Sequence, residues 1–344
     1  MTKRGTPQNP GNRFERVELF WEPGEEPTPS TEFLVDRTES ILTENRSPDI
    51  PFDWSVNPYR GCEHGCIYCY ARPTHEYLGF SAGLDFESRI LVKLQAAELL
   101  RRELRSPRWK PRLVALSGVT DPYQPVERKL KLTRGCLEVL VEMRNPVGIV
   151  TKNHLVTRDI DLLRELAAVD AVRVSISVTT LDRRLHRVME PRTSTPDRRL
   201  AAVEALARAL IPVAVLVAPV IPGLTEHEIP RILKAASDAG ARACHYQILR
   251  LPHGVRHLFE DWLRRRFPLR AERVLHRILE LRSGRLNDSR FHHRMRGEGP
   301  YARQIEDLFQ ATRRRLGLQP SLPAVSCAAF QRSGQLQLPF NASL

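Results

Sequence analysis

Apolar and polar positions follow two different periods between residues 51 and 250. Some short runs are apolar at consecutive or alternate positions, as in RLVALS at Arg112–Ser117 and AVRVSISV at Ala171–Val178. Such runs are typical of buried strands, whereas apolar residues three and four positions apart are typical of amphipathic helices. Strands are predicted at Phe52–Asn57, Arg112–Ser117, Val147–Thr151, Ala171–Val178, Pro212–Val220 and Ala243–Leu249. Helices are predicted at Asp85–Leu104, Thr133–Met143, Thr157–Ala167, Thr195–Leu210 and Thr225–Ala239.

This alternation of strands and helices predicts an α/β fold with a parallel sheet and right-handed crossovers. Six such units fit either an open barrel or a doubly wound sheet, and periodicity does not separate the two. In both folds, ligands bind at the carboxyl ends of the strands. Thr133 is predicted to cap its helix, and Gly240 is suited to a left-handed helix end.

The segments on either side of this core have different patterns. Residues 1–50 are rich in Pro, Glu, Thr and Asn, which predicts an extended arm packed on the domain, with short ordered pieces such as Val17–Trp21. Residues 51–250 form the predicted core, 251–320 a basic helical extension and 321–344 a tail. Within the extension, helices are predicted at Arg256–Arg266, Leu269–Leu281 and Pro300–Leu316, with Arg290–Tyr301 as a solvated connection.

Composition narrows the cellular setting and the class of partner. The formal net charge of +13 fits a polyanionic partner such as nucleic acid or a nucleotide, although solvated basic helix faces would explain it equally well. The sequence contains no run of 18 apolar residues, so no membrane span is predicted. The first 20 residues lack the apolar core of a signal peptide. We therefore expect a cytoplasmic protein.

Three cysteines stand close together after the first predicted strand, in the sequence GCEHGCIYCYAR from Gly61 to Arg72. Their CxxxCxxC spacing brings three thiolates to one soft-metal site and leaves one coordination position open, because closed structural sites usually take four protein ligands. Gly61 and Gly65 allow the tight turns that such a loop needs. The predicted metal ligands are Cys62, Cys66 and Cys69.

This motif, with Tyr68 before its last cysteine and a strand before its first, resembles that of the radical S-adenosylmethionine (SAM) superfamily. The resemblance implies a partial (βα)6 barrel and an enzyme whose three cysteines bind a [4Fe–4S] cluster, with SAM on the fourth iron. It also implies an external one-electron reductant of flavodoxin or ferredoxin type. The reduced cluster would cleave SAM to a 5′-deoxyadenosyl radical that abstracts hydrogen from a substrate.

The resemblance also assigns SAM contacts to residues at the predicted strand ends. Gly118, Thr120 and Asp121 stand where the family holds the SAM amino group, although this sequence lacks the usual Gly-Gly-Glu. Ser175 and Ser177 share one face of their strand and correspond to contacts with ribose or carboxylate. The further predicted contacts are Tyr68 beside the cluster, Lys152 and Arg192 for a carboxylate or phosphate, and Ile221 and Gly223 for adenine.

Two segments, GCEHGCIYCYAR and TDPYQPVE, resemble the spore photoproduct lyase-like group within the superfamily. That resemblance implies hydrogen abstraction from DNA or another nucleic-acid or nucleotide substrate, in a reaction like DNA-lesion repair. The lyase carries a hydrogen-donating cysteine just ahead of the Asp. Here Gly118 and Val119 occupy that place and Cys136 lies in the next helix, so no catalytic residue is assigned.

Alternative interpretations remain open at the level of sequence. The radical chemistry could act on a peptide or a metabolite. A non-enzymatic alternative is a zinc-stabilised nucleic-acid-binding module, in which His64 completes a Cys₃His site. In the tail, QLQLPF at Gln335–Phe340 resembles the short peptide that docks on the bacterial sliding clamp, which would add the clamp as a partner.

Overall fold

A seven-stranded sheet organises the chain, whose structure is a computed structural model that describes residues 4–14 and 30–332. The strand order is β10-β9-β8-β7-β6-β3-β2, and every neighbouring pair is parallel except β2 with β3. The strands are β2 Leu42–Glu44, β3 Trp54–Val56, β6 Val114–Leu116, β7 Val147–Thr151, β8 Val172–Ser177, β9 Val213–Val220 and β10 Ala243–Ile248. All six predicted strands are confirmed.

The order of these strands decides between the two folds that the sequence left open. From β3 to β10, each strand of this sheet lies beside the strand that precedes it within the same sheet. All crossovers therefore advance around the sheet in one direction. A doubly wound sheet would reverse its order at a switch point. The sheet is therefore a partial barrel, as the family resemblance implied. The carboxyl ends of its parallel strands lie at the same edge.

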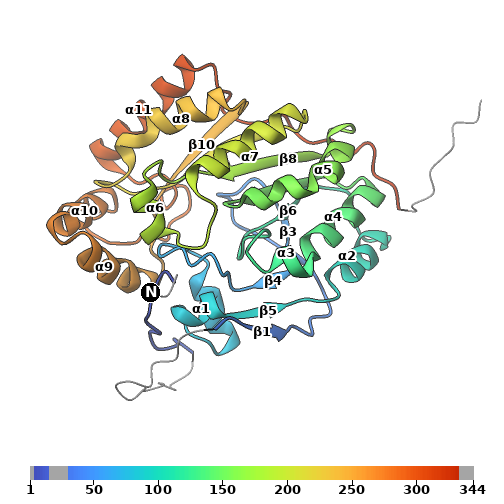
Figure 1. Ribbon diagram of the computed structural model, residues 1–344, viewed down its shortest axis with the longest axis horizontal. Coiled ribbons are helices and arrows are strands. Elements are labelled where there is room, and N and C mark those ends of the chain that lie inside the picture. Colours follow the sequence, from blue (N-terminus) through green and yellow to red (C-terminus); the bar gives the residue numbers. More distant parts are fainter. Residues whose placement is uncertain (1–3, 15–29, 333–344) are drawn as a thin grey trace, which may run out of the picture.

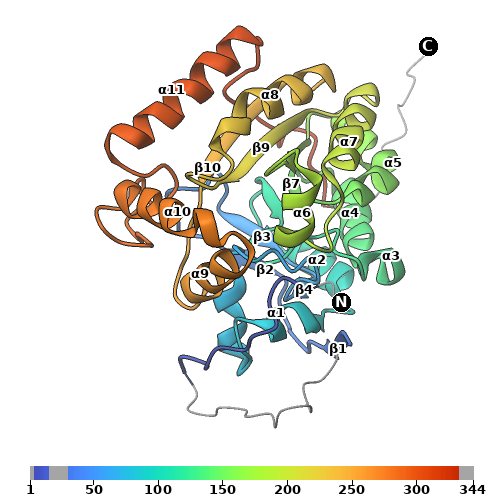
Figure 2. The same ribbon diagram turned by 60° about the vertical axis from the view of Figure 1, so that its left-hand side comes forward.

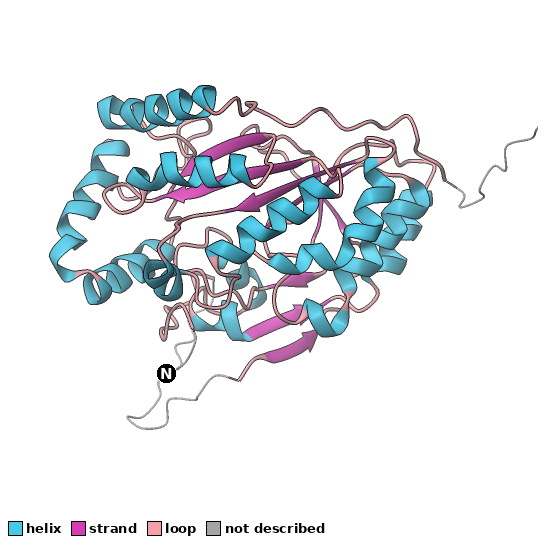
Figure 3. Cartoon of the chain, turned by 45° about the horizontal axis from the view of Figure 1, so that its top comes forward, coloured by secondary structure: helices cyan, strands magenta, loops and turns pink. Residues whose placement is uncertain are grey.

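Helices connect the strands and run along the outer side of the sheet (Figures 1 and 3). The apolar faces of most of these helices pack with the strands in the main hydrophobic core, because an amphipathic helix must bury its apolar stripe against another element. These helices are α2 Ala96–Arg105, α3 Glu127–Leu130, α4 Leu132–Met143, α5 Ile160–Ala167, α6 Arg183–Met189, α7 Pro196–Arg208 and α8 Ile229–Asp238.

The predicted helix Asp85–Leu104 is wrong as a single element. The structure divides it into α1 Leu84–Ser88, strand β5 Arg89–Val92 and α2. β5 lies between β1 Glu32–Val35 and β4 Tyr59–Arg60 in a second, three-stranded sheet. Ile90 and Val92 are buried on one side of β5. The predicted helix rested on Ile90, Leu91, Leu94, Ala97 and Leu100, whose spacing fits a helix. The pairing of β5 with two neighbouring strands overrode that periodicity.

Smaller corrections concern helix ends. Thr133 is not a cap, because Lys131 precedes α4 in the left-handed region with φ +53°. Thr133 lies within the helix, where its hydroxyl donates to the Pro122 carbonyl at 2.6 Å. The helices predicted from Thr157 and Thr225 begin as the 3₁₀ turns His154–Asp159 and Glu226–Glu228. Gly240 has φ +90°, which confirms the predicted left-handed end.

The N-terminal arm contributes a strand to each of the two sheets. Its strands β1 and β2 join the small and the large sheet respectively, while Val17–Trp21 lies outside the described residues. Asp49, between β2 and β3, accepts a hydrogen bond from the His292 backbone at 2.6 Å and pairs with Arg294. The predicted solvated connection Arg290–Tyr301 is thus tied to the arm.

The C-terminal extension consists of α9 Val255–Arg266, α10 Pro268–Leu281 and α11 Gly299–Arg315, which confirms the three predicted helices. α9 and α10 share an apolar cluster with Cys66, Ile67 and Tyr68, so they support the cysteine loop. Gln335–Phe340 lies outside the described residues. Among the described helices, none has the length and apolar character to cross a membrane.

The strand assignment of β5 predicts a larger loss of stability on truncation at Ile90 than at its neighbour Leu91. Ile90 is fully buried and Leu91 is only half-buried, so Ile90→Ala should lower the free energy of unfolding by about 2–5 kcal/mol. Leu91→Ala, the matched control, should cost less than about half of that because less of its surface is buried. Urea denaturation measures both. Equal losses at the two positions would contradict the alternation of a strand.

Candidate active site

The three cysteines lie in the cysteine loop, residues 61–71, between β4 and the 3₁₀ turn Arg72–Leu78. Cys62 and Cys66 are buried and Cys69 is half-buried. Burial raises the pKa of all three thiols, and Asp121, Cys69 and Cys66 raise the pKa of Cys62 further. Three thiolates so placed need a compensating positive charge, which a bound metal centre supplies.

The donor set fits an iron–sulfur cluster better than a single ion. Among the described residues, no group of three or more His, Cys, Asp or Glu side chains is spaced to hold one metal ion. A zinc ion draws its ligands to about 2.3 Å from one centre, whereas a [4Fe–4S] cube binds each thiolate on a different iron and keeps the sulfurs further apart. The three neighbouring thiols therefore suit the cluster.

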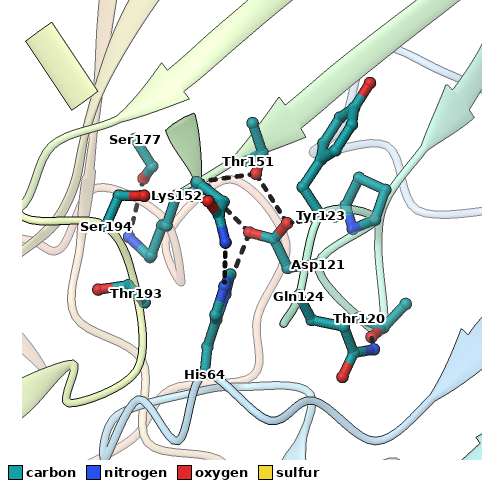
Figure 4. Close-up of polar contacts among 12 residues, drawn as sticks. His64, Thr120, Asp121, Tyr123, Gln124, Thr151, Lys152, Ser177, Thr193 and Ser194 are labelled. Atoms are coloured by element: carbon teal, nitrogen blue, oxygen red, sulfur yellow. Dashed lines mark hydrogen bonds and ion pairs between the residues drawn. The ribbon is translucent and has the colours of Figure 1, made fainter. Parts of the chain in front are cut away.

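His64 does not act as a fourth ligand in this arrangement. Its Nδ1 pairs with Asp121 Oδ2 at 3.4 Å, and its Nε2 contacts Asn153 Nδ2 at 3.2 Å. Both ring nitrogens are thus engaged with residues that follow strands, and Figure 4 shows the contact with Asp121. This weighs against the Cys₃His zinc site.

A buried ion pair fixes the shape of the cysteine loop. Arg72 and Glu87 pair with both side chains fully buried, and Arg72 also donates to the carbonyls of Cys66 at 3.0 Å and Gly83 at 2.8 Å. Glu87 accepts from the backbone N–H groups of Gly5 at 2.8 Å and Thr6 at 3.2 Å. The pair therefore holds the loop, α1 and the N-terminal segment, residues 4–14, in one arrangement.

Two glycines allow the N-terminal segment to lie against the loop. Gly65 has φ +66°, and a Cβ there would lie 2.6 Å from Glu87 Oε2. A Cβ on Gly5 would lie 1.8 Å from the Gly65 carbonyl oxygen. Neither position has room for a side chain, so the segment covers the loop backbone directly.

Asp121, in the turn that follows β6, connects the cysteine loop to the sheet. It accepts from the Thr151 hydroxyl at 2.7 Å and from the Lys152 backbone at 2.8 Å, and it pairs with His64 (Figure 4). Burial alone would raise the pKa of Asp121, but His64 and these hydrogen bonds hold that pKa below its usual value. Thr120 donates to the Gly61 carbonyl at 2.6 Å. Thr120 and Asp121 thus both contact residues of the cysteine loop.

Lys152 and Tyr68 meet at a buried carboxylate that the sequence analysis did not single out, Glu190. The Lys152 ammonium lies 3.3 Å from Glu190 Oε1, and the Tyr68 hydroxyl donates to the same oxygen. Lys152 also donates to Ser177 Oγ at 2.9 Å. Arg199 pairs with the other oxygen of Glu190. Burial would raise the pKa of Glu190, but Arg199 and Lys152 hold it far below its usual range.

The helix pattern around Arg199 already indicates that a buried carboxylate lies nearby. Arg199 occupies the first position of an i, i+3, i+4, i+7 stripe completed by Ala202, Val203 and Leu206, all of which are buried. A charged residue on an apolar helix face indicates a buried partner of opposite charge. Glu190, nine residues before it, is that partner.

The other predicted SAM contacts lie in different surroundings. Ser175 is half-buried in β8 and Ile221 is fully buried beside Cys66 and Tyr68. Arg192 pairs with Glu63 in the cysteine loop at 2.7 Å. Gly223 lies beside the C-terminal extension, since a Cβ there would be 3.4 Å from Val274 of α10.

Tyr70, which follows the last cysteine of the loop, was also not predicted. Its side chain is 46% exposed, and its hydroxyl donates to the Gly118 carbonyl at 2.9 Å. The guanidinium of Arg250, just beyond β10, lies 5.4 Å from the centre of its ring. Gly118 has φ +129°, and a Cβ there would meet nothing closer than Asn57 at 3.9 Å. Tyr70 and Arg250 thus present an aromatic face and a cation next to open backbone.

Comparison with known proteins gives three results. The sequence model of the Radical SAM superfamily matches residues 56–236. The uncharacterized protein Rv2578c of Mycobacterium tuberculosis (strain ATCC 25618 / H37Rv) is 42% identical over 221 residues, 64% of this chain and 65% of the relative. A radical SAM Nα-GlyT isomerase of Pseudomonas phage M6 is 28% identical over 192 residues, 56% of this chain and 35% of that protein. The match thus spans less than two thirds of the mycobacterial protein.

A solved structure shares the fold. Spore photoproduct lyase complexed with dinucleoside spore photoproduct superposes with a TM-score of 0.58 and 17% sequence identity, covering 83% of this chain and 80% of the lyase. At this identity the likeness concerns the fold alone. It confirms the predicted partial barrel.

Glu190 gives a test of the buried polar network. Glu190→Gln leaves Arg199 and Lys152 without a counter-charge, so the free energy of unfolding at pH 7 should fall by about 3–5 kcal/mol. The pKa of Glu190 is depressed in the folded state. Its stabilisation is therefore present above the unfolded value, ~4.3, and is lost as the pH falls further.

Urea denaturation at pH 7 and near pH 3 measures both effects. The wild type should lose more stability between these pH values than Glu190→Gln does. Glu204→Gln is the matched control, because Glu204 forms an exposed pair with Arg208 on α7 and should change the free energy by less than about 1 kcal/mol. Identical acid dependence of wild type and Glu190→Gln would refute the assignment.

Proposed function

The chain belongs to the radical SAM superfamily, and from this we propose that it cleaves SAM reductively to abstract hydrogen from a nucleic-acid or nucleotide substrate. Its cofactors are a [4Fe–4S] cluster and SAM. The observation that carries the proposal is the buried three-cysteine loop, which hydrogen bonds and ion pairs join to residues at the carboxyl ends of β6, β7 and β8. In a parallel α/β sheet this edge is where ligands bind.

The bound cofactors supply a 5′-deoxyadenosyl radical when one electron is delivered. The residues of the chain hold and orient them: Cys62, Cys66 and Cys69 are the cluster ligands. The Lys152 ammonium, 5.6 Å from the centre of the Tyr68 ring, is a cation that can pair with a carboxylate. Glu190 and Ser177 fix the position of this ammonium. Such prior positioning lowers the cost of ordering a charged ligand.

The surroundings of the cysteine loop exclude water. Cys66, Ile67, Tyr68 and Ile221 form one apolar cluster with residues of α9 and α10, and the N-terminal segment packs over Gly65. A reactive radical needs this exclusion, because water-filled sites permit side reactions.

Three observations support a nucleic-acid or nucleotide substrate. The net charge is +13, and Tyr70 and Arg250 offer the aromatic face and cation on which a base can stack. Spore photoproduct lyase, which shares the fold, binds a dinucleoside photoproduct. We do not propose the lyase reaction itself, because Gly118 and Val119 replace its hydrogen-donating cysteine and Cys136 is fully buried in α4.

SAM cleavage is tested by the release of 5′-deoxyadenosine. The anaerobically reconstituted protein should contain ~4 Fe and ~4 sulfide per chain and should release 5′-deoxyadenosine when dithionite and SAM are added. Cys66→Ala should abolish this release. Cys327→Ala, which removes an exposed cysteine, should leave it unchanged. Stoichiometric zinc without iron in the wild type, or undiminished release of 5′-deoxyadenosine by Cys66→Ala, would refute the proposal.

The substrate class is tested by Tyr70→Ala. Loss of one stacked base costs about 1–3 kcal/mol, so the affinity for a single-stranded oligonucleotide should fall by about five- to hundredfold. Tyr77→Ala, which removes a tyrosine that is 72% exposed, is the matched control and should bind as the wild type does. Fluorescence anisotropy with reconstituted protein at two salt concentrations measures this. Binding that is insensitive to both salt and Tyr70 would favour a peptide or metabolite substrate.

A further inference from the structure

A cavity of about 340 Å³ lies between the N-terminal segment and α9. In Figures 1 and 2 the dark blue start of the chain runs past α9 and α1 at the rim of the molecule. The residues that line the cavity are Arg4, Gly5, Pro7, Trp262, Arg265 and Arg266. Because Gly5 packs on Gly65, this cavity lies directly behind the cysteine loop.

The surface around the cavity is strongly basic. Between Val255 and Arg270 the chain has five arginines and two acidic residues. Arg265 pairs with Asp261, whereas Arg266 and Arg270 are exposed and add further positive charge. Leu269, between them, is 100% exposed. Arg265 and Arg266 end α9, and Leu269 and Arg270 lie in the first turn of α10; together we call these four residues the α9 arginine face. Its charge and its apolar side chain complement an acidic protein surface.

The floor of the cavity is connected to the cysteine loop by a short chain of contacts. The Trp262 indole N–H donates to the Val188 carbonyl at 3.0 Å. The carbonyl of the next residue, Met189, accepts from the Ile67 N–H at 3.1 Å. Ile67 follows Cys66 in sequence, and all of these side chains except Val188 are members of one buried apolar cluster. An electron that arrives at Trp262 therefore has a short route through packed protein to a cysteine ligand.

We infer that the α9 arginine face is the docking surface of an acidic one-electron carrier protein of flavodoxin type. This inference rests on the proposed function, which requires such a donor. At this surface the carrier is oxidised by one electron and the cluster is reduced by one electron. No bond forms or breaks, and no proton is transferred.

Geometry favours the carrier over nucleic acid as the occupant. A substrate must touch the radical, so it has to enter at the strand ends, where Tyr70 and Arg250 lie. An electron crosses a few layers of packed protein, so only the carrier can act from behind the cysteine loop. Complementary charge accelerates such an encounter and makes it sensitive to salt.

The test compares two double charge reversals in the reconstituted full-length protein. Arg265→Glu/Arg266→Glu changes the α9 arginine face, and Arg314→Glu/Arg315→Glu makes the same charge change at the exposed end of α11. The probe is a purified acidic flavodoxin. The first variant should bind it at least about tenfold more weakly at low salt, since like charges at an interface repel. The second should bind it within about twofold of wild type.

Stopped-flow spectroscopy supplies a second readout. Reduced flavodoxin should reduce the cluster of the α9 variant correspondingly more slowly, whereas dithionite should reduce the clusters of both variants as it does that of the wild type. Unchanged flavodoxin affinity in the α9 variant, or equal weakening in the α11 variant, would overturn the inference. So would loss of oligonucleotide binding with carrier binding intact, which would assign the face to nucleic acid. If arginine-dependent docking is found but dithionite yields no 5′-deoxyadenosine, the proposed function fails and the docking surface stands.

Discussion

The buried ion pair between Arg72 and Glu87 is the constraint on which the rest of the site depends. Both side chains are fully inaccessible to solvent, and removing one partner of such a pair typically costs about 3–5 kcal/mol. Arg72 holds the Cys66 carbonyl, and Glu87 holds the backbone of the N-terminal segment. The cysteine loop is therefore shaped by protein contacts and presents its three thiols together. The same contacts place the N-terminal segment, and with it Arg4, beside α9.

A second set of contacts joins this preformed loop to the sheet. His64 meets Asp121 in the turn that follows β6, and Tyr68 meets Glu190 and Lys152 beyond β8 and β7. These residues lie far apart in sequence and come together only because consecutive strands are neighbours in a partial barrel. Buried charges arranged in this way are costly unless each is paired, and here Asp121 and Glu190 have partners on more than one side. Fold and site are thus coupled through the strand ends.

The sequence predicted those features that local patterns encode. The six core strands have runs of apolar residues, and the cysteine spacing is visible within eight positions. β5 was missed because Ile90, Leu91 and Leu94 fit a helical stripe, and only the pairing with β1 and β4 shows that the segment is a strand. The partners of Asp121 and Arg192, and the contact of Gly223 with Val274, come from distant segments, so no local pattern contains them. The Glu190–Arg199 pair lies between these cases, since a charged residue in an apolar helical stripe was visible although its partner was not.

We propose that Cys62, Cys66 and Cys69 hold a cluster with one iron left open to SAM. Mössbauer spectroscopy of protein reconstituted with ⁵⁷Fe tests this most directly, in spectra recorded with and without SAM. We expect a [4Fe–4S] cluster in which one iron of the four changes its isomer shift when SAM is added and the other three do not. A cluster whose four irons are all unaffected by SAM, or a protein that takes up no iron, would contradict it.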